Sequence, residues 1–316
     1  HLGEEGNHPE NQGFDINIGG NDLGQPPSYF DPYLAKNAAP TYVLKNVPPR
    51  KEGEFLTDRE GDEMVKFIQN REGQFFIHWA PYAVHTPIMG PEQLVEKYKS
   101  KTPGIQKNPT YAALVENLDQ NVGKVMAELE RLGLRENTLI IFTSDNGGLI
   151  GNPQNPVTIN LGLRSFKGYP YEGGIRVPTI VSLPGLIQEG KVSETPIITM
   201  DWAPTILDMV GASEVQTDGQ SLSPILLQEE QIPNRDLFWH FPHYREPDVN
   251  PYSIVRSGHY KLIYYFDGGD VELFDLSKDP LEQSNLALEL PHQVAELKSK
   301  LEKWWKETGA RLPVRS

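Results

Sequence analysis

The sequence predicts an α/β protein: a mostly parallel central sheet with helices on both faces, followed by a small C-terminal α+β subdomain with an antiparallel sheet. Up to about residue 225, short continuous apolar runs alternate with amphipathic segments, as in parallel sheets covered on both sides. Beyond that point, β-rich runs lie directly next to each other. A chain of 316 residues can hold one large and one small domain, which we expect at 1–225 and 226–316.

The first part of the chain predicts loops, one helix and one strand. The first 50 residues are rich in glycine, asparagine and proline, which indicates extended loops. A helix is predicted over 57–70, because Thr57 and Glu60 have capping-box spacing and apolar residues follow on one side. The run QFFIHWAPY at 74–82 is typical of a short buried strand that ends at a proline.

The middle of the chain gives the clearest alternation of elements. A helix is predicted over 110–132, because apolar residues recur about every 3.6 residues and Gly133 ends the pattern. The runs TLIIFTSDNGG at 138–148 and VPTIVSLPG at 177–185 predict two further strands, and 200–212 predicts a short helix.

The C-terminal part predicts the smaller subdomain. The runs YSIVRSGHYKLIYYF and DVELFDLSKDP are joined by Asp-Gly-Gly, which indicates an antiparallel hairpin. The tail predicts a helix with one apolar face, formed by Val294, Leu297, Leu301 and Trp304.

The composition excludes several classes of partner and chemistry. The net charge of −14 argues against a nucleic acid or an anionic membrane as the main partner, although a local group of cations can still bind an anionic small molecule. No apolar run reaches the ~20 residues of a membrane span. Because the chain has no cysteine, it contains no disulfide, no thiolate metal ligand and no cysteine nucleophile.

Polar residues in loops suggest one reactive site. Singly, each has an ordinary interpretation: Asp145 and Asn146 in a turn, His85 on a surface loop, Lys167 as a solvated cation, and His1 as a terminal residue. Three of these loops border predicted strands, and loops at the carboxyl ends of strands converge in open α/β sheets. Aspartate and asparagine oxygens suit Ca²⁺ or Mg²⁺, and lysine and histidine donors suit a tetrahedral oxyanion. Together they indicate sulfuryl or phosphoryl transfer.

The motifs around these residues resemble a known family. HTP after a strand, SDNGG, FKGYPYEGGIRVPTIVSLPG and VRSGHYKLIYYF with VELFDLSKDPLEQSNLA occur in the order seen in type I sulfatases of the alkaline phosphatase superfamily. The opening HLG is similar to the end of that family's Gly-Lys-Trp-His-Leu-Gly motif. The resemblance covers nearly the whole chain and implies an alkaline phosphatase-like fold.

The resemblance implies a role for each of the five residues. Asp145 and Asn146 would be two ligands of a divalent metal, with Ca²⁺ favoured over Mg²⁺. Lys167 would contact both the sulfate and the nucleophile. His85 would bind a sulfate oxygen or protonate the leaving oxygen, and His1 would orient a geminal hydroxyl of the nucleophile.

Four more residues lie in the same motifs or near them. His243 and His240, in FWHFPHY, are in a region that often borders the substrate, and packing of aromatic loop residues is the alternative for both. Glu172 and Arg176 are interpreted first as residues that brace the loop.

The sequence also departs from the family pattern. The family nucleophile is a formylglycine made from Cys or Ser within Cys/Ser-x-Pro-Ser-Arg, and neither that motif nor the early Asp-Asp metal ligands occur here. We therefore expect this chain to be the C-terminal part of a sulfatase, with formylglycine in an N-terminal segment outside it. Such a chain would leave part of its sheet uncovered and would be inactive alone.

The expected function is hydrolysis of a sulfate ester of a sugar or aryl group in the intact parent enzyme. One alternative is a phosphodiesterase or phosphonate monoester hydrolase of the same superfamily, and another is a non-catalytic, sulfatase-like protein that binds anions. A sulfated small molecule or glycan is the expected partner. The resemblance implies a periplasmic or secreted protein, and the oligomeric state stays open.

Overall fold

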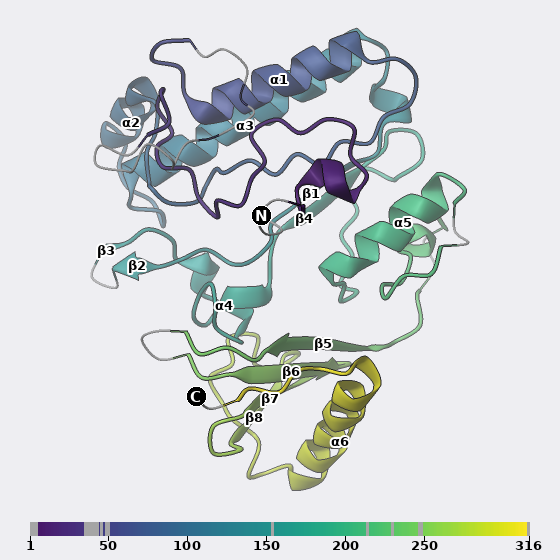
Figure 1. Cartoon of the computed structure of the whole chain (residues 1–316). Coiled ribbons are helices and arrows are strands. Elements are labelled where there is room, and N and C mark those ends of the chain that lie inside the picture. The colour runs from purple at the N-terminus through teal and green to yellow at the C-terminus, as the bar shows by residue number, and fades with distance from the viewer. Residues whose placement is uncertain are drawn as a thin grey trace. The chain divides into compact units, whose positions relative to one another are not determined.

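The computed structural model describes residues 6–34, 44, 47, 51–152, 155–212, 215–228, 231–245 and 249–314. The chain forms two compact units, His1–Thr138 and Leu139–Ser316 (Figure 1). The domain boundary that we predict between 225 and 226 lies inside the second unit and stays a prediction.

In the described part of the first unit, the regular elements are all helices. Its elements are a 3-10 helix at Pro9–Gln12, α1 at Leu56–Asn70, α2 at Glu92–Lys99, α3 at Pro109–Arg131 and a 3-10 turn at Arg135–Asn137. Helices α1 and α3 lie side by side (Figure 1). They approach closely because α1 has Gly61, where a Cβ would overlap the side chain of Asn121 on α3. The helices predicted over 57–70 and 110–132 are thereby confirmed.

Two local predictions in this unit are wrong. Helix α1 begins at Leu56 after Phe55, so Thr57 lies inside the helix and forms no capping box. The segment 74–80 has no regular secondary structure and belongs to no strand, and Phe76 is 59% exposed. An apolar run predicts extended backbone, whereas a strand also needs a neighbour to complete its hydrogen-bond ladder.

The core of the first unit lies beneath α1 and α3. Its buried members include Tyr29, Phe55 and Leu114, and the rings of Tyr29 and Phe55 stack with their centroids 5.4 Å apart. Residues 82–84 and Met89 pack against this cluster. The loop that carries His85 therefore rests on the core of this unit.

The second unit begins with α/β structure. Its elements are β1 at Ile140–Thr143, β2 at Gly151–Asn152, β3 at Asn155–Pro156, a 3-10 turn at Asn160–Gly162, α4 at Glu172–Ile175, β4 at Thr179–Ser182, a 3-10 turn at Thr199–Asp201, α5 at Trp202–Met209 and a π-helical turn at Pro224–Gln228. The strands and the helix that we predict at 138–148, 177–185 and 200–212 are confirmed as β1, β4 and α5.

Strands β1 and β4 pair with each other, and one face of this pair is covered. Ile141 and Val181 lie opposite each other and pack against a cluster around Trp202. Phe142 and Ile180 are the next opposite pair, and they are 40% and 62% exposed. The pair therefore has one buried face and one partly open apolar face.

The direction of this pairing corrects one part of the fold prediction. The α/β class with an antiparallel C-terminal subdomain is confirmed, but β1 and β4 are antiparallel, as are all strand pairs in the part of the chain that the structure describes. The mostly parallel sheet is therefore not what the described strands form. Continuous apolar strands indicate burial on both faces, and that property does not fix strand direction.

The second unit ends in a four-stranded antiparallel sheet in the order β5-β6-β7-β8. The strands are β5 at Asp236–Phe241, β6 at Tyr252–Ser257, β7 at Tyr260–Tyr265 and β8 at Val271–Asp275. Helix α6 at Pro291–Thr308 covers one face of this sheet (Figure 1). The predicted hairpin and terminal helix are confirmed, and the sequence interpretation missed β5.

The two faces of this sheet pack against different parts of the unit. Val255, Leu262 and Leu273 face Leu297 and Leu301 of α6. The alternate residues Ile254, Ile263 and Phe274 face Tyr169, Tyr171 and Ile175, which belong to the glycine-rich segment around α4. Because side chains alternate along a strand, this sheet joins α6 on one side to the segment that carries Lys167 on the other.

No helix in the described ranges is long and apolar enough to cross a membrane.

Candidate active site

The loop after β1 presents two oxygen donors. In this loop, Oδ1 of Asp145 accepts the backbone N–H of Asn146 at 2.9 Å and the hydroxyl of Ser144 at 3.4 Å. Nδ2 of Asn146 donates to the carbonyl oxygen of Gly147 at 2.9 Å. Within the described residues, no hydrogen bond is made by Oδ2 of Asp145 or by Oδ1 of Asn146, and the Asp145 residue is exposed.

The Lys167 loop is hydrogen-bonded to the loop after β1. The backbone N–H of Lys167 donates to the carbonyl oxygen of Gly148 at 3.3 Å. Asn160 ties both segments together, since its Nδ2 donates to the carbonyl oxygens of Gly148 and Ser165 at 3.1 Å each. The structure therefore brings together the loops of Asp145–Asn146 and Lys167, because the segment before β4 lies next to the end of the antiparallel strand β1.

A close backbone approach keeps these two loops together. The N–H of Gly147 donates to the carbonyl oxygen of Gly174 at 2.9 Å. A Cβ at Gly147 would overlap the carbonyl oxygen of Gly173, and a Cβ at Gly173 would overlap the carbonyl oxygens of Arg164 and Ser165. Both motifs need glycine here because there is no room for a side chain.

The donors in this loop suit part of a hard-cation site. The two oxygens of Asp145 and Asn146 that have no hydrogen bond to any described residue are the ligand type that Ca²⁺ and Mg²⁺ prefer. They fit the divalent metal that the sequence resemblance implies, but two oxygens are fewer than the six to eight ligands that Ca²⁺ takes. No group of three or more His, Cys, Asp or Glu side chains suited to a metal occurs among the described residues.

His85 belongs to the first unit and is held by its backbone. The Tyr29 hydroxyl donates to the carbonyl oxygen of His85 at 3.0 Å, and the His85 N–H donates to the carbonyl oxygen of Tyr82 at 2.8 Å. Nδ1 of His85 lies 3.1 Å from the hydroxyl of Thr86. These contacts fix the backbone of His85 and turn the Nδ1 side of its ring toward Thr86.

A buried carboxyl supports the same segment. Oε1 of Glu60 on α1 accepts the backbone N–H of Tyr82 at 3.4 Å, and its buried Oε2 has no hydrogen-bond partner in the described part of the chain. Burial raises the pKa of the Glu60 carboxyl to about 8, so it is mostly protonated at neutral pH. The proton belongs on Oε2, because Oε1 already accepts a hydrogen bond.

The two histidines at the end of β5 and in the loop after it differ. The ring nitrogens of His240 are engaged inside the unit, at 2.6 Å from the Ser253 hydroxyl and 2.8 Å from the carbonyl oxygen of Arg311. His243 is exposed, and its ring centroid lies 5.4 Å from that of Phe241. These contacts favour the packing interpretation for His240, while substrate binding by His243 stays a prediction.

Three groups around the Lys167 loop escaped the sequence interpretation. Arg245 donates from Nη1 to the carbonyl oxygen of Lys167 at 2.9 Å. Lys261 forms two buried ion pairs, one with Glu172 and one with Glu282. The one signal in the sequence was Lys261 itself, a charged residue inside the apolar strand pattern YKLIYY.

The predicted site residues are distributed over both units of the chain. His1 lies outside the described residues. His85 lies in the first unit, whereas Asp145, Asn146 and Lys167 lie in the second. The catalytic, metal-binding and substrate-binding roles of all these residues remain predictions.

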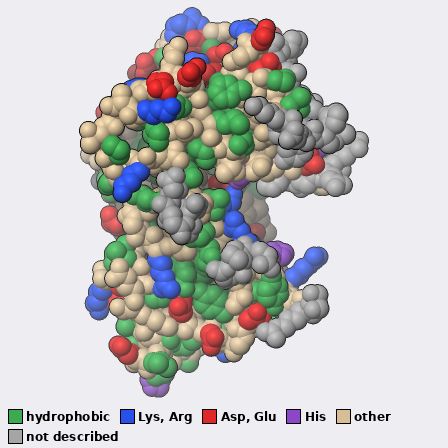
Figure 2. Space-filling view, turned by 90° about the vertical axis from the view of Figure 1, so that its left-hand side faces the viewer, with side chains coloured by type: hydrophobic (Ala, Val, Ile, Leu, Met, Phe, Trp, Pro, Cys, Tyr) green, Lys and Arg blue, Asp and Glu red, His purple; other side chains and the backbone are tan. Residues whose placement is uncertain are grey.

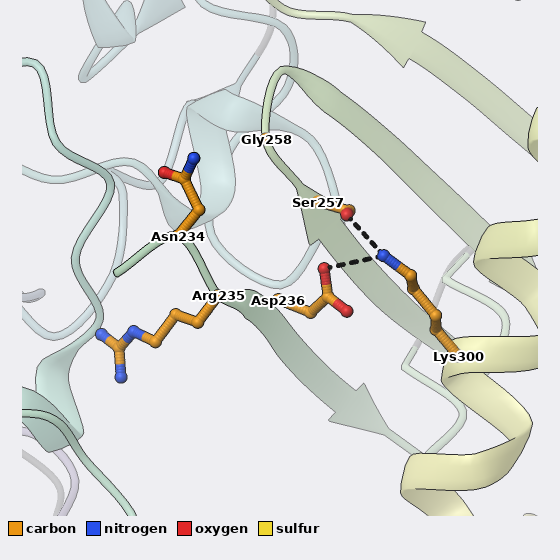
Figure 3. Close-up of a pocket in the computed structure, with 6 residues that line it drawn as sticks. All are labelled: Asn234, Arg235, Asp236, Ser257, Gly258 and Lys300. Carbon is orange, nitrogen blue, oxygen red and sulfur yellow. Dashed lines mark hydrogen bonds and ion pairs between the residues drawn. The ribbon is translucent and has the colours of Figure 1, made fainter. Parts of the chain in front are cut away.

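A separate cleft of about 300 Å³ lies near the start of β5 and contains none of the predicted site residues. Its lining includes Lys300, whose Nζ is bound to Oδ1 of Asp236 at 3.2 Å and to the Ser257 hydroxyl at 2.9 Å (Figure 3). Because Asp236 neutralises Lys300 and Asp201 neutralises Arg235, the other cation of the lining, this cleft is a poor anion site. On the face shown in Figure 2, basic and acidic side chains are interspersed, so an anionic ligand has to be recognised locally.

Comparison with known families identifies both parts of the chain. The family model described as Sulfatase matches residues 2–212. A second family model, described as N-sulphoglucosamine sulphohydrolase, C-terminal, matches residues 165–308. The two matches overlap over the segment that carries Lys167 and α4.

Relatives and solved structures agree with these matches. A sulfatase of Formosa agariphila is 37% identical over 300 residues, which cover 85% of this chain and 52% of that protein. The N-acetylgalactosamine-6-sulfatase of Mus musculus is 32% identical over 280 residues, covering 83% and 50%. The crystal structure of Ps i-CgsB in complex with k-i-k-neocarrahexaose matches with a TM-score of 0.77 and 25% identity, over 96% of this chain and 68% of that one. The chain spans about half the length of the curated relatives it matches.

Proposed function

Because this chain belongs to the sulfatase family, we propose that the intact natural protein hydrolyses a sulfate ester. One observation supports the proposal most: the Lys167 N–H is hydrogen-bonded to Gly148, directly beyond the Asp145–Asn146 pair. Two oxygen donors for a metal and a cationic side chain therefore come from adjacent, hydrogen-bonded loops. Sulfate transfer needs this pairing, because negative charge on the sulfate oxygens has to be stabilised.

Each predicted site residue has a defined task in this proposal. Asp145 would hold the divalent metal through Oδ2, and Asn146 would hold it through Oδ1. The Lys167 ammonium binds a sulfate oxygen, and Arg245 and Gly148 fix its backbone on both sides. His85 binds a sulfate oxygen or donates a proton to the leaving oxygen.

The metal and the formylglycine that sulfatases use would supply charge neutralisation on sulfate and the attacking hydroxyl. We propose Ca²⁺ as the metal, because an exposed carboxylate and an amide oxygen suit a large cation with flexible geometry. His1 is proposed to orient the nucleophile.

The substrate is proposed to be a sulfated glycan. Two relatives support this class: one is named an N-acetylgalactosamine-6-sulfatase, and the other was solved in complex with k-i-k-neocarrahexaose. His243, which is exposed on the loop after β5, is the candidate contact to the sugar. We place the intact protein in the periplasm or outside the cell, and cell fractionation tests that location.

The Asp145→Ala variant of the intact protein tests the proposed function. The substitution removes one of the two metal-binding oxygens that the loop after β1 supplies. It should reduce metal-dependent release of 4-nitrophenol from 4-nitrophenyl sulfate by about a hundredfold or more. Activity should also disappear with EDTA and return with Ca²⁺. The assay is repeated with 4-nitrophenyl phosphate, because a phosphoryl-transfer enzyme would prefer that ester.

Asp270→Asn is the matched control, because Asp270 lies in the β7–β8 hairpin away from the loop after β1. It should retain wild-type turnover. Wild-type turnover in Asp145→Ala, or hydrolysis of the phosphate ester alone, would contradict the proposal.

A further inference from the structure

A buried ion cluster lies between the C-terminal sheet and the Lys167 segment. Nζ of Lys261 on β7 is 3.0 Å from Oε1 of Glu172 on α4 and 2.8 Å from Oε1 of Glu282. The side chains of Lys261, Glu172 and Glu282 are 1%, 6% and 0% exposed. A fully buried lysine is rare, and burying three charges is costly, so a simple gain in stability does not explain the cluster.

Glu282 joins this cluster to the glycine-rich segment at two points. Besides its ion pair, its Oε2 accepts the backbone N–H of Glu172 at 2.6 Å. Its carbonyl oxygen accepts Nη1 of Arg164, also at 2.6 Å. Glu282 has a φ of 55°, a left-handed conformation that costs energy for a residue with a side chain. The strained backbone places its side chain and its carbonyl oxygen toward both ends of the segment 164–172.

The contacts of Glu282 lie on both sides of Lys167 in the sequence, and the proposed reaction needs Lys167. Arg164 lies three positions before Lys167, and Glu172 lies five positions after it. The Arg164 guanidinium also lies 3.7 Å from the ring centroid of Tyr171, whose hydroxyl donates to Glu272 of β8 at 2.7 Å. Both ends of the Lys167 loop are thereby fixed to the sheet.

We propose that Lys261, Glu172 and Glu282 form a positioning cluster that holds the Lys167 loop in its reactive geometry. The C-terminal sheet is thus part of the catalytic apparatus, although none of the three side chains acts on the substrate. This inference rests on the proposed function, in which Lys167 binds the sulfate. A misplacement of about 1 Å at a reacting group can reduce the rate by about a hundredfold, so a rigid support has catalytic value.

The first test is Lys261→Met in the intact protein. Methionine keeps the length of the stem but leaves two buried carboxyls without their cation. We expect kcat to fall by about tenfold or more, with a smaller change in KM. Trypsin should also cleave after Arg164 or Lys167 faster than in the wild type, because the loop is released at both ends.

A second variant keeps the test decisive if Lys261→Met does not fold. The triple variant Lys261→Met, Glu172→Gln, Glu282→Gln removes all charges together, which is often tolerated in protein interiors. It should fold with a Tm near the wild-type value and still show the lower kcat and the faster cleavage. A triple variant that matches the wild type in both properties would overturn the positioning role.

Lys300→Met is the matched control. Lys300 also links a helix to strands of the same sheet, through Asp236 and Ser257 (Figure 3), and none of its described contacts is with residues 164–176. It should lower Tm slightly and leave kcat and tryptic cleavage of the loop unchanged. An equal loss of kcat in Lys300→Met would overturn the proposal, because it would mean that general loss of subdomain stability is sufficient.

Trypsin cleavage separates this inference from the proposed function. If the wild type hydrolyses no sulfate ester, the proposed function fails, while faster cleavage in the variants still supports the cluster as the anchor of the loop. If the wild type is active and the variants keep its kcat, the inference alone fails.

Discussion

Two loops of this protein carry predicted functional side chains, and they are supported in opposite ways. The His85 loop lies on an apolar cluster and is held by the hydroxyl of Tyr29 and the carboxyl of Glu60, which burial keeps protonated. The Lys167 loop is held by buried ion pairs and by glycines packed directly on backbone. One support is neutral and the other is charged.

This difference shows how each support can be lost. A neutral carboxyl fails when pH rises enough to remove its proton. A buried ion cluster fails when one of its members is deleted, because the remaining charges are uncompensated. The predictions below act on one support at a time.

The largest effect is expected for Gly147→Ala, which disrupts the second support. A Cβ at this position would overlap the carbonyl oxygen of Gly173, and backbone cannot move aside as a flexible side chain can. We expect a loss of about 1–3 kcal/mol or more in stability, measured by urea unfolding. Sulfate ester hydrolysis should fall by about a hundredfold, because the loop that holds Asp145 is displaced.

Gly123→Ala is the control for this substitution. Gly123 lies within α3, and a Cβ there would meet no atom within 4 Å. Alanine should therefore stabilise the helix by about 0.5–1 kcal/mol. A Gly147→Ala variant with normal stability and activity would mean that the two loops do not need this close approach.

The next effect concerns the pH dependence of the first support. The folded pKa of Glu60 is about 8, above its ordinary value of 4.5, so the folded chain keeps a proton that the unfolded chain loses in this range. The contribution to stability is complete below about pH 4.5 and is lost as pH rises toward about 8, by at most about 1.4 kcal/mol per pH unit. Glu60→Gln stays neutral and should remove this slope.

Urea unfolding of the wild type and Glu60→Gln at about pH 5, 6.5 and 8 measures this effect. The two should be similar at the lowest pH, and the variant should be the more stable one at the highest. Glu72→Gln, at an exposed position, should keep the wild-type slope. A slope that persists in Glu60→Gln would assign the pH dependence to another group.

The smallest effect is expected for Tyr29→Phe. This change removes one hydroxyl from a fully buried ring and leaves the carbonyl oxygen of His85 without that donor. We expect a loss of about 1–2 kcal/mol in stability and a severalfold loss of kcat. A thermal scan and a kinetic assay measure these changes, and an unchanged kcat would mean that this contact does not position His85.

Much of the fold could be predicted from the periodicity of the sequence. Helices α1, α3 and α6 follow from apolar residues at helical spacing, and the β6–β8 meander follows from β-rich runs around Asp-Gly-Gly. The predicted strand at 74–82 and the predicted parallel direction of β1 and β4 were wrong for a common reason. An apolar run reports burial, whereas strand pairing and direction depend on a neighbour elsewhere in the chain.

The candidate site could also be predicted only in part. The Asp145–Asn146 loop lies beside the Lys167 loop, but for another reason than the predicted one, since the Lys167 loop precedes β4 and β4 is antiparallel to β1. The Lys261 cluster could not be predicted, because Glu172 and Glu282 are 89 and 21 positions from Lys261 and only the folded sheet brings them together. Lys261 is a charged residue within the apolar strand pattern YKLIYY, but the sequence does not indicate its partners.

The central claim is that Asp145, Asn146 and Lys167 form one site for a metal and a sulfate group. A crystal structure of the intact protein soaked with Ca²⁺ and inorganic sulfate tests it directly. The account predicts Ca²⁺ at about 2.3–2.6 Å from oxygens of Asp145 and Asn146, with a sulfate oxygen on the Lys167 ammonium. Ca²⁺ bound elsewhere, or a sulfate that does not contact Lys167, would contradict it.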